Sequence, residues 1–115
     1  MVLEVAPGRA VEQLVDQLDL TPADVARSLN VDVRTLARWR SGTTYPQHEG
    51  RERLAALLAL NHRLRESFQS IEAARQWLRD PSRYLGGLTP VEALRAGRTD
   101  RVEAALEALD SGVFL

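Results

Sequence analysis

The sequence has no cysteine, which excludes disulfides, thiolate metal sites and cysteine nucleophiles. All 15 basic residues are arginine, and the formal net charge is -1, so any contact with nucleic acid must come from a local basic patch. No apolar run approaches the roughly 18 residues of a membrane helix. The first ten residues also lack the basic start and long apolar stretch of a signal peptide. We therefore expect a cytoplasmic protein that does not contact a membrane.

Aromatic residues make up only 5% of the chain, so leucine, valine and alanine must build its core. A length of 115 residues allows one domain, or two very small ones that share a core. No segment shows the alternation of apolar and polar residues that is typical of a strand, and the pattern of every segment indicates helix or turn. We therefore predict an all-α fold. The expected helices carry apolar stripes in the ranges 11–18, 22–29, 33–40, 51–68, 71–78, 90–96 and 102–109.

Helix ends can be predicted from capping residues. Thr21 followed by Pro22 is typical of an N-cap and a first helical position, and Asp32 is a good N-cap for the next helix. The run 89–92 has the pattern of a capping box with proline at its first helical position. In the core we expect both tryptophans to be largely buried, with Leu109 inward on the last helix and with Val33, Leu36 and Ala37 near one inward face.

Residues 20–42 have the spacing of a helix-turn-helix, in which two short helices flank a turn of three to four residues. The predicted second helix directs Arg34, Thr35 and Arg38 outward, where they could reach base edges and phosphates, and Arg40 could extend the phosphate contacts. The alternative is a helical hairpin with a solvated charged face, which would make the chain an adaptor that does not bind DNA.

Catalytic patterns are missing from the sequence. Its two histidines, His48 and His62, have neither H-E-x-x-H spacing nor cysteine partners, and no serine lies in a nucleophile elbow. A helical chain this short also rarely encloses a catalytic pocket. We therefore predict no enzymatic activity, no catalytic residue, no metal and no cofactor.

The last forty residues carry an ordered set of short motifs. They are Trp77-Leu78, Leu85-Gly86-Gly87-Leu88-Thr89-Pro90, Leu94-Arg95-Ala96-Gly97, Arg101-Val102 and Gly112-Val113-Phe114. This set resembles the toxin-binding domain of the Xre/MbcA/ParS antitoxin family. The resemblance covers about residues 70–115, and the helix-turn-helix before it is similar to the family's usual partner domain.

This resemblance implies a function. In the family the cognate toxin has a RES fold, which resembles ADP-ribosyltransferases and consumes NAD. The antitoxin's carboxyl-terminal module packs on the toxin and blocks its active site, while the helix-turn-helix commonly represses the shared operon. The expected organisation is a helix-turn-helix domain (1–48), a connecting or dimerisation helix (49–69) and a toxin-binding domain (70–115). The expected partners are the RES-domain toxin, operator DNA and a second copy of the chain within a toxin–antitoxin hetero-oligomer.

Candidate toxin-binding residues lie in a glycine loop, an arginine-rich stretch and the carboxyl end. Gly86-Gly87 lets a backbone approach a partner closely, and a short apolar peptide ending in a carboxylate could enter a dinucleotide pocket. The alternative to partner contact is that the arginines form a solvated surface and that the tail folds back onto the core. A second hypothesis is that the chain is a helix-turn-helix repressor whose carboxyl-terminal region only mediates dimerisation. The candidates are Tyr84, Leu85, Gly86, Gly87, Arg98, Arg101, Gly112, Val113, Phe114 and Leu115.

Overall fold

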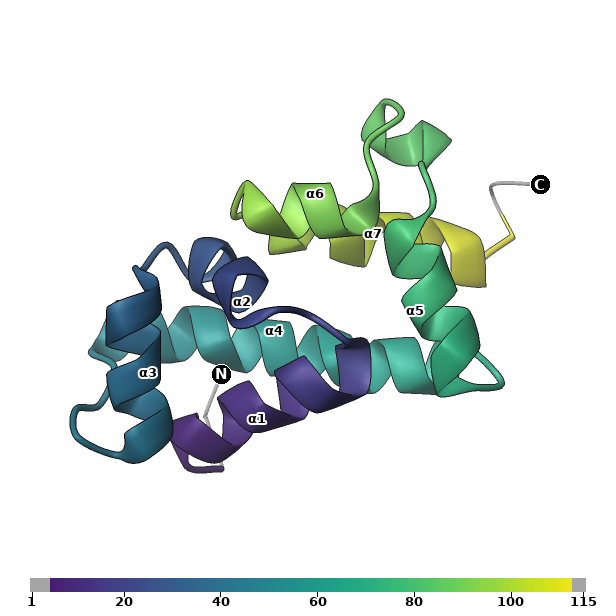
Figure 1. Ribbon diagram of the computed structural model, residues 1–115. Coiled ribbons are helices and arrows are strands. Elements are labelled where there is room, and N and C mark those ends of the chain that lie inside the picture. Colours follow the sequence, from purple (N-terminus) through teal and green to yellow (C-terminus); the bar gives the residue numbers. More distant parts are fainter. Residues whose placement is uncertain (1–4, 113–115) are drawn as a thin grey trace.

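The computed structural model describes residues 5–112, and over this range the chain is helical and contains no strand (Figure 1). The predicted all-α fold is therefore confirmed. The elements are α1 (Pro7–Leu18), α2 (Pro22–Ser28), α3 (Val33–Ser41), α4 (His48–Ser67), α5 (Ile71–Arg79), the short 3-10 turn η1 (Arg83–Leu85), α6 (Pro90–Arg95) and α7 (Thr99–Asp110).

The two helices α1 and α4 run side by side through the molecule (Figure 1). At one end α3 crosses them, and α2 lies between α3 and the carboxyl-terminal helices. Helices α5, α6 and α7 cover the rest of α1, α2 and α4. The buried side chains of all seven helices form one continuous cluster, so the described residues share a single core.

The caps predicted for α2 and α3 form as expected, whereas the cap that the sequence predicts for the last helix, Thr99 or Asp100, does not form, because α7 already begins at Thr99 and has no side-chain cap. Thr21 accepts a hydrogen bond from the Asp24 backbone N–H, and Asp24 accepts one from the Thr21 backbone N–H, which completes a capping box at α2. Asn30 leaves α2 with a left-handed φ of 58°. Asp32 then caps α3 by accepting the Thr35 backbone N–H at 2.7 Å. These caps fix the geometry of the helix-turn-helix.

The structure corrects several predictions. Helix α4 begins at His48, three residues before the predicted start at Arg51, and no side chain caps it. Trp39 is buried, but Trp77 is only half-buried, with its ring against Phe68 at a centroid distance of 5.8 Å. Leu109, expected inward, is 39% exposed. Ala108 is buried in its place, because α7 presents a slightly different face to α4 and α6 than its leucine stripe suggested.

The register of α3 also differs from the prediction. Val33 is 51% exposed and Ala37 is exposed, whereas Leu36 and Trp39 are buried. The large indole of Trp39 occupies the space against α4, where it lies beside Gly50 and Pro46. With Leu36 and Trp39 inward, the helical repeat turns Val33 and Ala37 toward solvent.

Polar contacts join the helix-turn-helix to the carboxyl-terminal helices. Arg95 of α6 donates from Nε to Asp24 of α2 at 2.6 Å. Arg75 donates to the carbonyl oxygens of Asp16 and Gln17, and Arg79 donates to that of Asp19. The carbonyls at the end of α1 lack helical partners, so these arginines satisfy them. No helix within residues 5–112 is long and apolar enough to cross a membrane.

Candidate functional site

The outward surface of α3 is built from four exposed residues. Val33, Arg34, Ala37 and Arg38 are all exposed, and with 3.6 residues per turn they share one face of the helix. We call these four residues the α3 surface. Thr35 is only half-exposed and lies at its edge. The structure therefore places Arg34 and Arg38 on one surface, as predicted. The same surface also contains Val33 and Ala37, which the sequence predicts to face the core.

Arg40 does not belong to the α3 surface. Its Nε and Nη2 donate to Oε1 of Glu12 on α1, at 2.8 and 2.6 Å. Both side chains are partly exposed, so the ion pair contributes little stability by itself. It nevertheless directs Arg40 toward α1, and the predicted phosphate contact would require this pair to open.

The glycine loop after α5 is closed by its own backbone. Ser82 N–H donates to the Leu88 carbonyl at 2.9 Å, and Gly87 N–H donates to the Ser82 carbonyl at 2.8 Å. Gly86 and Gly87 have φ values of 69° and 93°, a region that disfavours side chains. Leu85, predicted to contact the toxin, is buried and belongs to the core. The loop therefore presents Tyr84, Gly86 and Gly87 at the surface, with Leu85 as its anchor.

An apolar hollow of about 200 Å³ lies beside this loop. Half-buried Trp77 and exposed Leu109 are part of its wall, and Leu88 nearby in sequence is 47% exposed. The sequence predicts that Trp77 and Leu109 are buried, because each completes an apolar stripe on its helix, and so it does not identify them as surface residues. The hollow is lined by Trp77, Asp80, Pro81, Ser82, Arg83, Tyr84, Ala105 and Leu109.

The predicted toxin-binding residues do not converge on one place. Arg98 and Arg101 lie at the start of α7, whereas Gly112 follows its end, a separation of about 20 Å at 1.5 Å per residue. Arg98 forms an ion pair with Asp100 at 3.0 Å, and the hydrogen bonds from Arg98 lower the pKa of Asp100. The predicted residues Val113, Phe114 and Leu115 lie outside the described residues.

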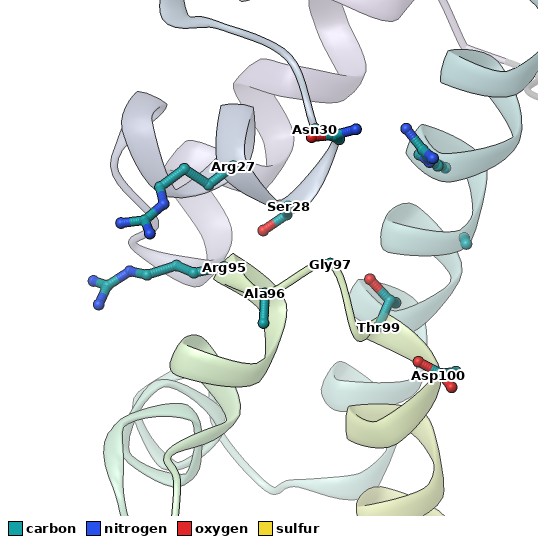
Figure 2. Close-up of a pocket in the computed structure, with 10 residues that line it drawn as sticks. Arg27, Ser28, Asn30, Arg95, Ala96, Gly97, Thr99 and Asp100 are labelled. Carbon is teal, nitrogen blue, oxygen red and sulfur yellow. The ribbon is translucent and has the colours of Figure 1, made fainter.

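A larger hollow of about 500 Å³ lies where the two halves of the chain meet (Figure 2). Arg27 and Arg95 extend from α2 and α6 on the same side of it. Arg95 is held by Asp24, and Arg53 across the hollow is held by Glu49 at 2.7 Å. Two of its three arginines are thus already paired, so we assign this hollow to the junction of the two halves. It is lined by Arg27, Ser28, Asn30, Arg53, Ala56, Arg95, Ala96, Gly97, Thr99 and Asp100.

Comparisons with known proteins agree on one family. The profile of the antitoxin Xre/MbcA/ParS C-terminal toxin-binding domain matches residues 63–112. The mycobacterial cidal antitoxin MbcA of Mycobacterium tuberculosis is 30% identical over 105 residues, which cover 91% of this chain and 92% of the relative. The probable mycobacterial cidal antitoxin Rv3188 of the same species is 34% identical over 118 residues, covering 98% of this chain and all of that protein.

A solved structure extends the similarity to the fold. A chain in the crystal structure of the M. tuberculosis MbcT–MbcA toxin–antitoxin complex superposes with a TM-score of 0.69 at 29% identity, over 94% of this chain and 96% of that one. The similarity therefore includes the helix-turn-helix as well as the carboxyl-terminal helices. On the sequence, the fold and the matched domain together, the chain belongs to the Xre/MbcA/ParS family of antitoxins.

Proposed function

We propose that this antitoxin neutralises a cognate RES-type toxin that degrades NAD, by covering the toxin's active site, and that it represses its own operon through the helix-turn-helix. The observation that carries the first part is the match of residues 63–112 to a toxin-binding domain. The relative of known structure comes from a toxin–antitoxin complex. The RES fold and the NAD chemistry follow from the family resemblance of the sequence.

The distribution of exposed apolar side chains supports two separate partner surfaces. Among the described residues, the large exposed apolar side chains are Val33, Tyr45, Tyr84, Leu88 and Leu109. The first two belong to α3 and the loop after it, and the other three lie around or near the apolar hollow. Exposed apolar groups that cluster in this way mark interaction sites. We assign the hollow and its rim to the toxin.

The two surfaces lie toward opposite ends of the molecule. Helix α3 is at one end, and the end of α7 with the neighbouring η1 turn is toward the other (Figure 1). A toxin bound at the hollow would therefore leave the α3 surface accessible. This arrangement would let an antitoxin hold its toxin and its operator together.

The test compares two variants in two assays. Leu109→Arg places a charge in the apolar hollow, whereas Arg34→Ala alters only the α3 surface. We expect Leu109→Arg to weaken inhibition of NAD consumption by the purified toxin from the neighbouring gene at least tenfold, because a central apolar anchor contributes about 2 kcal/mol or more. Arg34→Ala should inhibit the toxin normally but lose affinity for the DNA upstream of the operon. Failure of the unaltered chain to inhibit NAD consumption would contradict the proposed neutralisation.

The carboxyl end is assigned to the toxin's active-site entrance. Deletion of Val113–Leu115 should abolish or greatly weaken neutralisation, because Phe114 offers a large apolar area for a pocket. Helical content and DNA binding should persist, since the buried residues of α7 are all retained. A bulky tag after Leu115 should interfere with inhibition, whereas the same tag before Met1 should not. Equal inhibition by the full and truncated chains would move the blocking surface to the hollow alone.

A further inference from the structure

Two apolar side chains of the α3 surface lie outside the hydrophobic core. Val33 is 51% exposed although it is the first residue of α3, and Ala37 one turn later is also exposed. The core side of the same helix is already filled by Leu36 and Trp39. Both side chains are therefore available to a partner that α3 contacts.

The surroundings of this pair are cationic. Exposed Arg34 and Arg38 lie beside Val33 and Ala37 on the same face. The neighbouring carboxylate of Asp32 accepts the Thr35 backbone N–H, and this hydrogen bond lowers the pKa of Asp32. Asp32 therefore stays ionised, but the two arginines outnumber this one carboxylate. A helical face with arginines next to small apolar groups suits the DNA major groove, which admits an α-helix and presents guanine acceptors and thymine methyls.

We propose that Val33 and Ala37 contact the 5-methyl groups of thymines in the major groove, while Arg34 and Arg38 contact guanine edges or phosphates next to them. This inference rests on the proposed operator binding and names the chemical feature that the α3 surface recognises. Thymine is the base that presents a methyl group in the major groove, and small apolar side chains are its usual contacts. Tyr45, in the loop after α3, is 68% exposed, and its hydroxyl is of the type that contacts phosphates.

The experiment removes the methyl groups from the DNA. The probe is the duplex upstream of the chain's own operon, synthesised once with thymine and once with uracil, which differs from thymine only by the missing 5-methyl. The full chain is titrated against both probes in mobility-shift assays at about 50 mM salt. Loss of one buried methyl weakens binding roughly fourfold, so contact with two methyls predicts a loss of about tenfold or more on the uracil probe.

Variants separate the methyl contact from other effects of uracil. Val33→Ser removes one of the two apolar groups, at a helix start that tolerates serine, so it should lower the preference for thymine DNA from about tenfold to roughly fourfold, the effect of the one methyl that Ala37 still contacts. The double variant Val33→Ser, Ala37→Ser should bind both probes equally. Arg34→Ala should weaken binding to both probes and keep the difference between them. Ala73→Ser, on the exposed face of α5, is the matched control and should behave as the unaltered chain. Normal inhibition of the toxin by Val33→Ser shows that this variant is folded.

Each result decides a different question. Equal affinity of the unaltered chain for thymine and uracil DNA overturns this inference but leaves operator binding intact. A uracil effect that keeps its full size in the double variant Val33→Ser, Ala37→Ser would reflect DNA shape, and it also overturns the inference. A change of oligomeric state in Val33→Ser, measured by analytical ultracentrifugation, would assign the face to self-association instead. Absence of binding to either probe, with or without toxin, removes the repressor role itself.

Discussion

Gly8 allows the backbones of α1 and α3 to touch. A Cβ at this position would lie 2.8 Å from the carbonyl oxygens of both Trp39 and Arg40. Glycine to alanine in a helix normally stabilises by about 1 kcal/mol, but here we expect Gly8→Ala to destabilise by roughly 1–3 kcal/mol, because two backbones must separate. Urea unfolding measures this difference. A variant as stable as the unaltered chain would mean that α1 and α3 are less tightly apposed.

Asp24 links the helix-turn-helix to α6 through a titratable group. Burial raises its pKa, but the hydrogen bonds from Arg95 and Thr21 outweigh burial, so the pKa lies below its usual value. A lowered folded pKa means that the stabilisation is complete above the unfolded pKa of about 3.9 and is lost as pH falls through the folded value. The Asp24→Asn variant should therefore show a shallower loss of stability below about pH 4.

The pH dependence is measured by urea unfolding at several pH values between about 2 and 7. Asp16→Asn, which changes an exposed carboxylate on α1, is the control and should keep the slope of the unaltered chain. Equal slopes for Asp24→Asn and the unaltered chain would show that the pair with Arg95 does not couple the two halves.

Helix boundaries were predictable where a side chain marks them. Thr21, Asp32 and Thr89 each cap the helix that the sequence assigned to them. The predicted start of α4 was wrong because no side-chain cap marks the beginning of this helix. The prediction of which α3 residues are buried was wrong for a different reason. A nine-residue helix with apolar groups on two faces fits more than one burial pattern, and only packing against the neighbouring helices, chiefly α1 and α2, selects Leu36 and Trp39.

Helix α6 depends on its cap because it has only six residues. Thr89 accepts the Glu92 backbone N–H at 3.1 Å, and Glu92 accepts the Thr89 backbone N–H at 3.0 Å. Thr89→Ala should cost about 1 kcal/mol in urea unfolding. Thr99→Ala is the matched control, since α7 begins there without a side-chain cap, and we expect less than about 0.5 kcal/mol. Equal losses in both variants would contradict a specific role for the cap.

The connection between the two halves could not be predicted from the sequence. Periodicity finds the apolar face of each helix but does not say which helix that face meets. From the sequence, Arg79 and Arg95 could equally belong to a solvated charged surface, whereas in the structure they bond to Asp19 and Asp24. No sequence pattern singled out Arg75, which bonds to the end of α1. The family, by contrast, was recognisable from the order of motifs after Trp77. As a member of an antitoxin family the chain is not an enzyme, as its sequence predicted.

The shared core predicts that the helix-turn-helix is not stable without the carboxyl-terminal helices. A fragment of residues 1–69 lacks α5, α6 and α7, and so exposes the faces of α1, α2 and α4 that these helices cover. It also loses the arginines that bond to the end of α1. We expect the full chain to unfold in one cooperative thermal transition, and the fragment to show a much lower midpoint or none.

Circular dichroism during heating measures both transitions. The matched control is a fragment of residues 1–112, which retains all seven helices and should unfold as the full chain does. In a mobility-shift assay the 1–112 fragment should bind operator DNA as the full chain does, and the 1–69 fragment should not. The reason is that α3 can present its surface only when α1, α2 and α4 are packed. A 1–69 fragment that melts cooperatively near the full-length midpoint and still shifts operator DNA would contradict this interdependence. The antitoxin would then consist of two modules that fold independently.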